Sequence, residues 1–225
     1  MIKYALAVIL FFLSLCPEAV ASNIYAGMKC DQIVRNYYYQ TCYDYNIKGP
    51  RYVAYKLRGS KVNSRNILNR PNFRPEKKIP KKYRAYSGDY VYNKFHADRG
   101  HLASDASFDY SKNALHSVYS MVNVIPQYYL INRYTWVKAE DYTRSLAVRY
   151  GTIYVLDGIE YSKNPPRMGK SQIAYPKAFW KAITNKLGFD ICFRYINTSK
   201  VDVNTDTLMS HKVSCSTLKI PKNWK

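Results

Sequence analysis

The feature that most limits the possible folds is one long helix-forming segment in a chain that otherwise contains short extended runs. The helical pattern begins at Tyr128 and continues to about Tyr150, where Gly151 provides a helix stop. Short runs rich in β-branched and aromatic residues precede and follow it, as is typical of strands. Together these patterns predict an α+β fold with a central antiparallel sheet flanked by helices.

Several shorter elements are expected around this helix. The expected strands cover residues 52–57, 152–158, 173–175, 179–183 and 190–197. A strand or turn is expected at 89–96, a helix at 111–117, and a short extended piece at 121–126 that a proline ends. Residues 26–43 are expected to form a short helix or loop, and residues 58–86, which are basic and contain three prolines, a long surface loop.

The first residues have the pattern of a secretory signal peptide. One early positive charge is followed by an apolar run over residues 4–15 and by Ala19-Val20-Ala21, a small-residue cleavage pattern. The run is too short to span a bilayer, so we expect residues 1–21 to be removed. Residues 22–225 would then form a single domain, secreted or periplasmic, without stable membrane association. An uncleaved anchor or a lipoprotein at Cys16 is the alternative.

Four cysteines remain after such cleavage, and they predict disulfides. They are Cys30, Cys42, Cys192 and Cys215, and four cysteines allow three pairings. The expected set is Cys30–Cys42 and Cys192–Cys215, with one bridge near each end of the chain. No pair has the C-x-x-C spacing of zinc or redox sites, so structural bridges are favoured over thiol or metal chemistry.

The net charge of the chain is +20, from 35 Lys and Arg against 15 Asp and Glu. Such an excess predicts a polyanionic partner: nucleic acid, anionic lipid or a cell-wall polymer. Some of the 24 tyrosines, which cluster at Tyr37-Tyr38-Tyr39 and Tyr128-Tyr129, could stack on bases, although most are expected to be packing residues. Charge and tyrosine content alone do not distinguish a nuclease from a binding protein.

Polar side chains recur every four residues along the predicted helix. Asn132, Glu140 and Arg144 share one face with Trp136, which is expected in the core. Asn132 and Glu140 are two turns apart, about 12 Å along an ideal helix, so they are not expected to bind one small cation directly. Asn132 is the expected ligand, and Glu140 is expected to hold metal-bound water. Mg²⁺, with Mn²⁺ as the alternative, suits this arrangement because it keeps several waters.

The segment Asp98-Arg99-Gly100-His101 supplies a candidate base. His101 titrates in the neutral range and would take a proton from water that attacks phosphorus. Arg99, and more weakly Arg70 from the basic loop, would bind the phosphate. Gly100 is expected to permit a tight bend beside the histidine. The other histidines have less support in the sequence: His96, His116 and His211.

Three sequence blocks in combination resemble the DNA/RNA non-specific endonuclease family, whose members have a ββα-metal (His-Me finger) active site. The blocks are residues 95–103 (FHADRGHLA), 122–127 (VNVIPQ) and 130–144 (LINRYTWVKAEDYTR). Residues 175–181 resemble the proline-aromatic-lysine region of the family, and the similarity runs from about residue 52 to about residue 197. Ser104 departs from the family pattern, which commonly has proline there.

The resemblance implies roles for individual residues. It implies His101 as the general base, Asn132 as the direct metal ligand and Glu140 as the residue that acts on metal-bound water. It also implies that Arg99 and Arg144 lie at the phosphate.

The resemblance also implies which residues bind the substrate and which reaction the protein catalyses. Arg70 matches the upstream arginine of the family, and Asn123 would support the site beside it. The implied protein is a magnesium-dependent endonuclease that cuts DNA and RNA and contacts mainly their phosphates, with a homodimer left open. A basic nucleic-acid-binding or DNA-uptake protein on the same fold, without significant turnover, is the alternative function.

Overall fold

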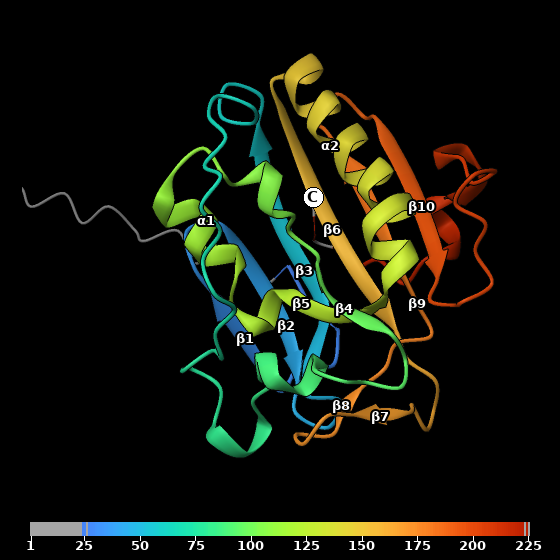
Figure 1. The fold of residues 1–225 in the computed structure, drawn as a ribbon. Helices are drawn as coiled ribbons and strands as arrows, with labels where there is room; N and C mark the ends of the chain where they lie inside the picture. Colours follow the sequence, from blue (N-terminus) through green and yellow to red (C-terminus); the bar gives the residue numbers. More distant parts are fainter. Residues whose placement is uncertain (1–23, 26, 223, 225) are drawn as a thin grey trace, which may run out of the picture.

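A seven-stranded antiparallel sheet forms the centre of the described part of the chain (Figure 1). The computed structural model describes residues 24, 25, 27–222 and 224. The strand order across the sheet is β1-β2-β3-β6-β9-β10-β11. The strands are β1 (Gln32–Arg35), β2 (Tyr39–Asp44), β3 (Gly49–Arg58), β6 (Thr152–Glu160), β9 (Ala178–Thr184), β10 (Asp190–Ile196) and β11 (Lys212–Val213).

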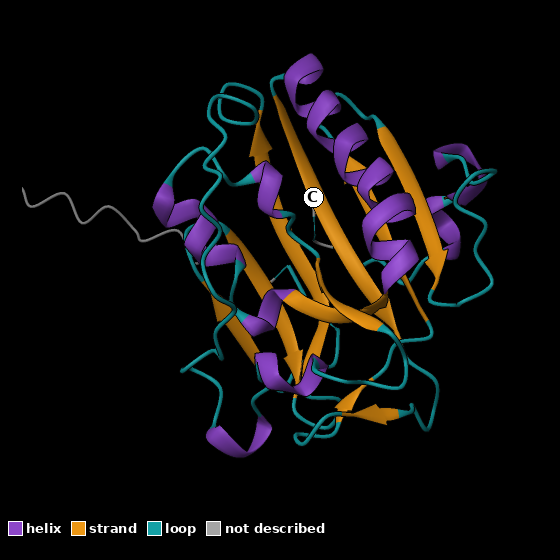
Figure 2. Ribbon diagram, in the orientation of Figure 1, coloured by secondary structure: helices purple, strands orange, loops and turns teal. Residues whose placement is uncertain are grey.

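One face of this sheet carries the main helices and a separate two-stranded hairpin, as Figure 2 shows. These elements are β4 (Ala97–His101), β5 (Val124–Tyr128), α1 (Lys112–Val118) and α2 (Trp136–Tyr150). A π-helix at Ile131–Thr135 leads directly into α2. A further small hairpin pairs β7 (Arg167–Met168) with β8 (Ile173–Ala174). The α+β prediction of a large antiparallel sheet with helices packed on it is confirmed.

Alternation along the strands sends side chains into two cores, one on each face of the sheet. On the helix side, Tyr55 of β3 belongs to the same buried cluster as Trp136 of α2. On the opposite face, Trp180 of β9 is clustered with Tyr25 and Trp224, which come from the two ends of the described chain. The terminal segments therefore cover the sheet face that the helices leave open.

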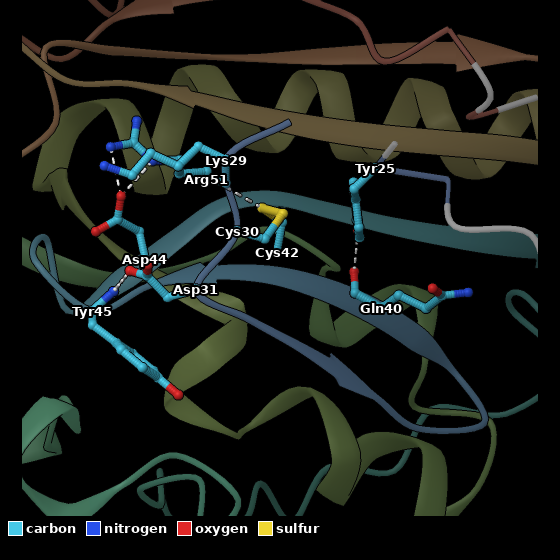
Figure 3. The surroundings of a disulfide bond; sticks show 9 residues. All are labelled: Tyr25, Lys29, Cys30, Asp31, Gln40, Cys42, Asp44, Tyr45 and Arg51. Carbon is cyan, nitrogen blue, oxygen red and sulfur yellow. Dashed lines mark hydrogen bonds and ion pairs between the residues drawn. A yellow bond between two sulfur atoms is a disulfide. The ribbon is translucent and has the colours of Figure 1, made fainter. Parts of the chain in front are cut away.

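Both predicted disulfides are confirmed, and each fastens a flanking segment to the sheet. Cys30–Cys42 joins the segment before β1 to β2 (Figure 3). Cys192–Cys215 joins β10 to the C-terminal segment. Beside the first bridge, the Tyr25 hydroxyl donates a hydrogen bond of 2.6 Å to the Gln40 carbonyl, which holds the N-terminal segment against β2.

Most of the elements expected from the sequence are present. Residues 52–57, 152–158, 173–175, 179–183 and 190–197 fall on β3, β6, β8, β9 and β10, and residues 111–117 fall on α1. The helix stop is confirmed at Gly151, whose φ of 74° is easily adopted only by glycine. Ser111 caps α1, because its Oγ accepts a hydrogen bond of 3.2 Å from the Ala114 amide.

The expectation of a helix or loop at residues 26–43 is wrong. This stretch contains β1 and the start of β2, which pair as an antiparallel hairpin at one edge of the sheet. Asn36 shapes the turn, because its Oδ1 accepts hydrogen bonds from the Tyr38 and Tyr39 amides at 2.8 and 2.9 Å.

Two details around the Asp-Arg-Gly-His segment also differ from expectation. Gly100 lies inside β4 and makes no tight bend; a Cβ there would lie 2.2 Å from Gln127 Cδ, so the glycine permits close approach of a neighbouring side chain. Of the extended piece expected at 121–126, Met121–Asn123 form a 3-10 helix; the strand β5 begins only at Val124 and continues past Pro126 to Tyr128. A proline is tolerated there because β4 and β5 form a sheet of only two strands.

A buried ion pair lies at the centre of the sheet. Asp157 of β6 is directly opposite Lys181 of β9, with Lys181 Nζ 2.6 Å from Asp157 Oδ1, and both side chains are 0% exposed. The ammonium also donates to the Tyr55 hydroxyl at 2.8 Å and lies 4.6 Å from the Trp136 ring centroid. Removal of one partner would leave the other as an uncompensated buried charge.

The predicted signal peptide lies outside the described residues. Within residues 24, 25, 27–222 and 224, no helix has the length and apolar character needed to cross a membrane.

We expect Lys181→Met to lower the free energy of unfolding by about 3–5 kcal/mol at pH 8, because it leaves the Asp157 carboxylate buried and unpaired. Burial raises the pKa of Asp157 to about 6 even beside the lysine. Without the lysine that pKa rises further, so the loss grows as pH increases through it and is smaller at pH 5. Urea unfolding at the two pH values measures the difference.

The matched control for this measurement is the double variant Asp157→Asn/Lys181→Met, which has no unpaired charge. It should be more stable at pH 8 than Lys181→Met alone. Equal stabilities of Lys181→Met at pH 5 and pH 8 would contradict the interpretation.

Candidate active site

The hairpin β4–β5 and the helix that follows bring the predicted catalytic residues to one region. His101 ends β4, opposite Val124 of β5. The π-helix begins three residues after β5 ends, and α2 follows it directly at Trp136. The Trp136 indole Nε1 donates to the His101 carbonyl at 3.3 Å, which fastens the helix to the strand. The chain therefore has the strand-strand-helix unit that the sequence resemblance implies.

His101 has an enclosed, largely aromatic environment. Its imidazole lies against Phe73 and Tyr119, with centroid separations of 5.0 and 4.8 Å. Burial lowers the pKa of His101 to about 4, the Asp105 carboxylate opposes that shift and the Arg70 guanidinium adds to it. The ring is therefore neutral at neutral pH, as a proton acceptor must be.

The π-helix places Asn132 against Asp98 of β4. Asn132 Nδ2 donates to Asp98 Oδ2 at 3.1 Å, and Arg133 holds the same carboxylate with two bonds of 2.7 and 2.9 Å. With its amide nitrogen fixed in this way, Asn132 has Oδ1 left over, and no described residue donates to that oxygen. An amide oxygen held in one orientation is a suitable ligand for a hard cation.

Glu140 lies two helical turns further along, near two cations. Burial raises the pKa of Glu140 to about 8, while Lys181 and Arg144 oppose the shift and Asp105 adds to it. Asp105 therefore acts on the pKa of both His101 and Glu140, which places the two side chains in one electrostatic environment. Among the described residues, no donor forms a hydrogen bond with the Glu140 carboxylate.

These residues fit a hydrated divalent cation better than a cation enclosed by protein. No cluster of three or more His, Cys, Asp or Glu side chains able to hold a metal occurs among the described residues. One amide oxygen and one carboxylate without protein donors match the chemistry of Mg²⁺ and Mn²⁺, which bind few protein ligands and keep their waters. Asn132 would be the ligand, and Glu140 would accept hydrogen bonds from the water.

The three predicted phosphate-binding arginines are placed differently. Arg70 pairs with Asp105 at 3.0 Å and Asp109 at 3.3 Å, and it is close enough to His101 to affect its pKa. Arg144 pairs with Asp141 and has a buried Nη1 without a hydrogen-bond partner. These two guanidiniums lie in the surroundings of His101 and Glu140.

Arg99 makes its hydrogen bonds outside that group. Its Nε and Nη2 donate to the Ser87 carbonyl at 3.2 and 2.9 Å, and its guanidinium packs against Phe73 and Tyr90. In this arrangement Arg99 holds the segment before β4. Its phosphate-binding role stays a prediction.

Asn123 supports the site from the interior. The side chain is 0% exposed; Oδ1 accepts from the Ala103 amide, and Nδ2 donates to the Ala103 and Val118 carbonyls, each at 2.9 Å. Asn123 thereby fixes the loop that follows His101 from within the core.

The other histidines lie in different settings. His96 and His116 are exposed, and His211 pairs with Asp206 at 2.6 Å.

Sequence reasoning missed two residues that organise the site. Asp98 was part of the recognised motif, but its role in orienting Asn132 depends on a strand-to-helix contact. Lys181, whose Nζ lies 3.5 Å from the Leu102 carbonyl, supports the residue after His101. A lone lysine in the apolar run of residues 178–183, together with a lone aspartate in the run of residues 153–159, was an available signal for a buried pair.

Comparison with known proteins agrees with this geometry. The family model described as DNA/RNA non-specific endonuclease matches residues 16–219. Human mitochondrial endonuclease G is 31% identical over 156 residues, which are 64% of this chain and 52% of that protein. A nuclease of Nostoc sp. is 32% identical over 139 residues, which are 61% of this chain and 49% of that protein.

A solved structure shows the same fold. The crystal structure of the EndoG/EndoGI complex matches with a TM-score of 0.74 at 20% identity, and the match covers 86% of this chain and 85% of that chain. The chain spans about half the length of the curated relatives it matches.

We expect NMR titration of the His101 imidazole in the metal-free protein to give a midpoint near 4 rather than the ordinary 6.5. Asp105→Asn should lower the midpoint further, because the carboxylate favours the charged ring. A His101→Gln sample identifies the resonance. A midpoint at 6.5, or one that rises in Asp105→Asn, would contradict the described environment.

We expect Asp98→Ala to weaken Mn²⁺ binding about ten- to a hundredfold, because Asn132 loses the partner that orients its amide. Calorimetric titration with the metal alone gives the affinity. Arg133→Ala is the matched control, since it removes the Arg133–Asp98 ion pair but keeps the Asp98–Asn132 bond. Equal weakening in both variants would show that the ion pair, and not the amide, matters.

Proposed function

The chain belongs to the DNA/RNA non-specific endonuclease family, and from this premise we propose that it hydrolyses phosphodiester bonds of DNA and RNA with little sequence preference. The observation that carries the proposal is the joining of a neutral, buried His101 to a helix that presents Asn132 and Glu140. Nucleic-acid binding alone requires neither a proton acceptor nor a cation ligand.

In the proposed reaction His101 acts as general base. Its low pKa keeps the imidazole unprotonated, so it can take a proton from water as the water attacks phosphorus. Mg²⁺, or Mn²⁺ in its place, would neutralise charge on the phosphate and the leaving oxygen. Asn132 is the proposed ligand through Oδ1, and the bond from Nδ2 to Asp98 fixes the orientation of the amide.

The arginines around the site serve the phosphate. Arg70 is held by Asp105 and Asp109, so its guanidinium is fixed before substrate binds. Arg144 approaches Glu140 from the next turn of α2 and carries a buried Nη1 that still lacks an acceptor. A phosphate oxygen would satisfy that donor.

We further propose that the protein acts outside the reducing cytosol, secreted or in a periplasm. Two disulfides support this location, since such bonds persist in oxidising compartments.

We expect His101→Ala to lower the cleavage of plasmid DNA and of RNA at least about a hundredfold in the presence of Mg²⁺, because the base is lost. A chelator should stop cleavage by the parent protein. His116→Ala, which changes an exposed histidine on α1, is the control and should cut normally. Circular dichroism checks that both variants are folded.

Two results would contradict the proposed reaction. One is full activity of His101→Ala, and the other is activity that persists in chelator. Tight binding by the parent protein with no cleavage would instead support the alternative of a nuclease-fold binding protein.

A further inference from the structure

A cleft whose lining includes none of the proposed catalytic residues lies between the tip of the β1–β2 hairpin and the end of β3. Its volume is about 140 Å³, and Tyr38, Phe108 and Tyr110 line it together with Arg58 and Lys61. A cavity of about 150 Å³ holds one benzene ring, so the space suits a single flat aromatic group. An adjoining hollow of about 510 Å³ shares half of this lining and adds Arg65, so the cleft opens into a groove.

The walls of the cleft are aromatic and held in place. Tyr37 is 83% exposed, and its ring meets Tyr38 edge-on at 5.1 Å. Tyr38 in turn packs edge-on against Phe108 at 6.2 Å. Asn36 Oδ1 accepts hydrogen bonds from the Tyr38 and Tyr39 amides, which orders the turn that carries Tyr37. The exposed ring is therefore presented from an ordered turn, and less backbone entropy is lost when it is covered.

The rim of the cleft is positive. Lys56, Arg58, Lys61 and Arg65 are all exposed, and within the described part of the chain none of them forms a salt bridge. No Asp or Glu lines either the cleft or the groove. These cations differ from Arg70, Arg133 and Arg144, which are all paired with carboxylates.

The cleft is connected to the active site through one short segment. Ser107 and Phe108 in its wall come two and three residues after Asp105, which acts on the pKa of His101 and pairs with Arg70. The Ile67 amide donates to the Asp109 carbonyl at 3.3 Å, so the loop from Arg58 to Arg70 is fastened along the same segment. The segment from Asp105 to Asp109 therefore links the wall of the cleft to the surroundings of His101.

We propose that this cleft is a binding subsite for an unpaired nucleobase of a single-stranded nucleic acid, distant from the bond that is cut. The base stacks on Tyr37 and Tyr38, and the flanking phosphates meet Arg58 and Lys61. A duplex does not offer such a base, because its bases are stacked inside. The inference rests on the proposed function for its substrate class and adds a preference for single-stranded regions.

The test is equilibrium binding in the His101→Ala background with chelator, so that no cleavage occurs. The probe is a fluorescein-labelled oligothymidylate of roughly a dozen nucleotides at low salt, followed by anisotropy. Tyr37→Ala should weaken binding roughly five- to a hundredfold, the range of one lost base–aromatic stack. Tyr37→Trp should restore it, and Arg58→Gln/Lys61→Gln should weaken binding and reduce its salt dependence.

The controls locate the effect. Tyr92→Ala changes a fully exposed tyrosine in another segment, and Lys163→Gln changes an exposed lysine in the loop after β6, beyond the far end of the sheet. Both variants should bind like the parent. A duplex of the same length should bind equally to Tyr37→Ala and to the parent.

Several results would overturn the subsite. They are no measurable binding of the oligonucleotide, Tyr37→Ala within twofold of the parent, Tyr37→Trp as weak as Tyr37→Ala, or equal weakening in Tyr92→Ala. Because these measurements involve no catalysis, a failure of the proposed cleavage reaction remains a separate finding.

Discussion

The buried pair of Lys181 and Asp157 is the interaction on which the rest of the structure depends. Both charges lie in the middle of the sheet at 0% exposure, where an unpaired charge would be very costly. The lysine reaches the Tyr55 hydroxyl on β3, the Trp136 ring on α2 and the Leu102 carbonyl after β4. One ammonium thus connects three strands of the sheet to the helix and to the loop behind His101.

This central charge also influences the chemistry above it. The same cause, burial, lowers the pKa of His101 and raises the pKa of Glu140, so both groups favour their neutral forms. The neutral form of the histidine can accept a proton and so act as a base. For the glutamate, ionisation is favoured by Lys181 and Arg144, and a bound cation would favour it further. The fold therefore provides a neutral base, His101, and a carboxyl group, Glu140, whose ionisation a bound cation would favour.

Local signals in the sequence were sufficient for several features that depend on neighbours along the chain, although not for all of them. Gly151 ends α2, Ser111 begins α1, and the cysteine positions predicted both bridges. A lone charge in each of two apolar runs could suggest a buried pair, but which residues meet depends on the β6–β9 register across 24 residues. The edge hairpin β1–β2 was missed because its turn depends on one asparagine side chain.

At the site, the sequence blocks gave the identities of the residues but not their orientation. Regular four-residue spacing predicts Asn132 on the α2 face, yet the chain forms a π-helix at that point, and Asp98 decides where the amide points. Arg99 is two residues from His101, and Phe73 lies against both side chains. The Arg99 guanidinium nevertheless donates to the Ser87 carbonyl. Such choices are made by contacts between distant segments, which spacing along the chain does not encode.

The positive side chains fall into two groups, paired and unpaired, that cannot be distinguished from the composition alone. Arginines near His101 and Glu140 are paired with carboxylates, which fixes their direction and reduces their pull on distant anions. The exposed cations beside Tyr37 form no such pairs among the described residues, so their field extends into solvent. A polyanion would therefore be attracted first by the unpaired groups and aligned afterwards by the paired ones. Long-range attraction of the polyanion and its local alignment therefore depend on different cationic side chains among those that give the net charge of +20.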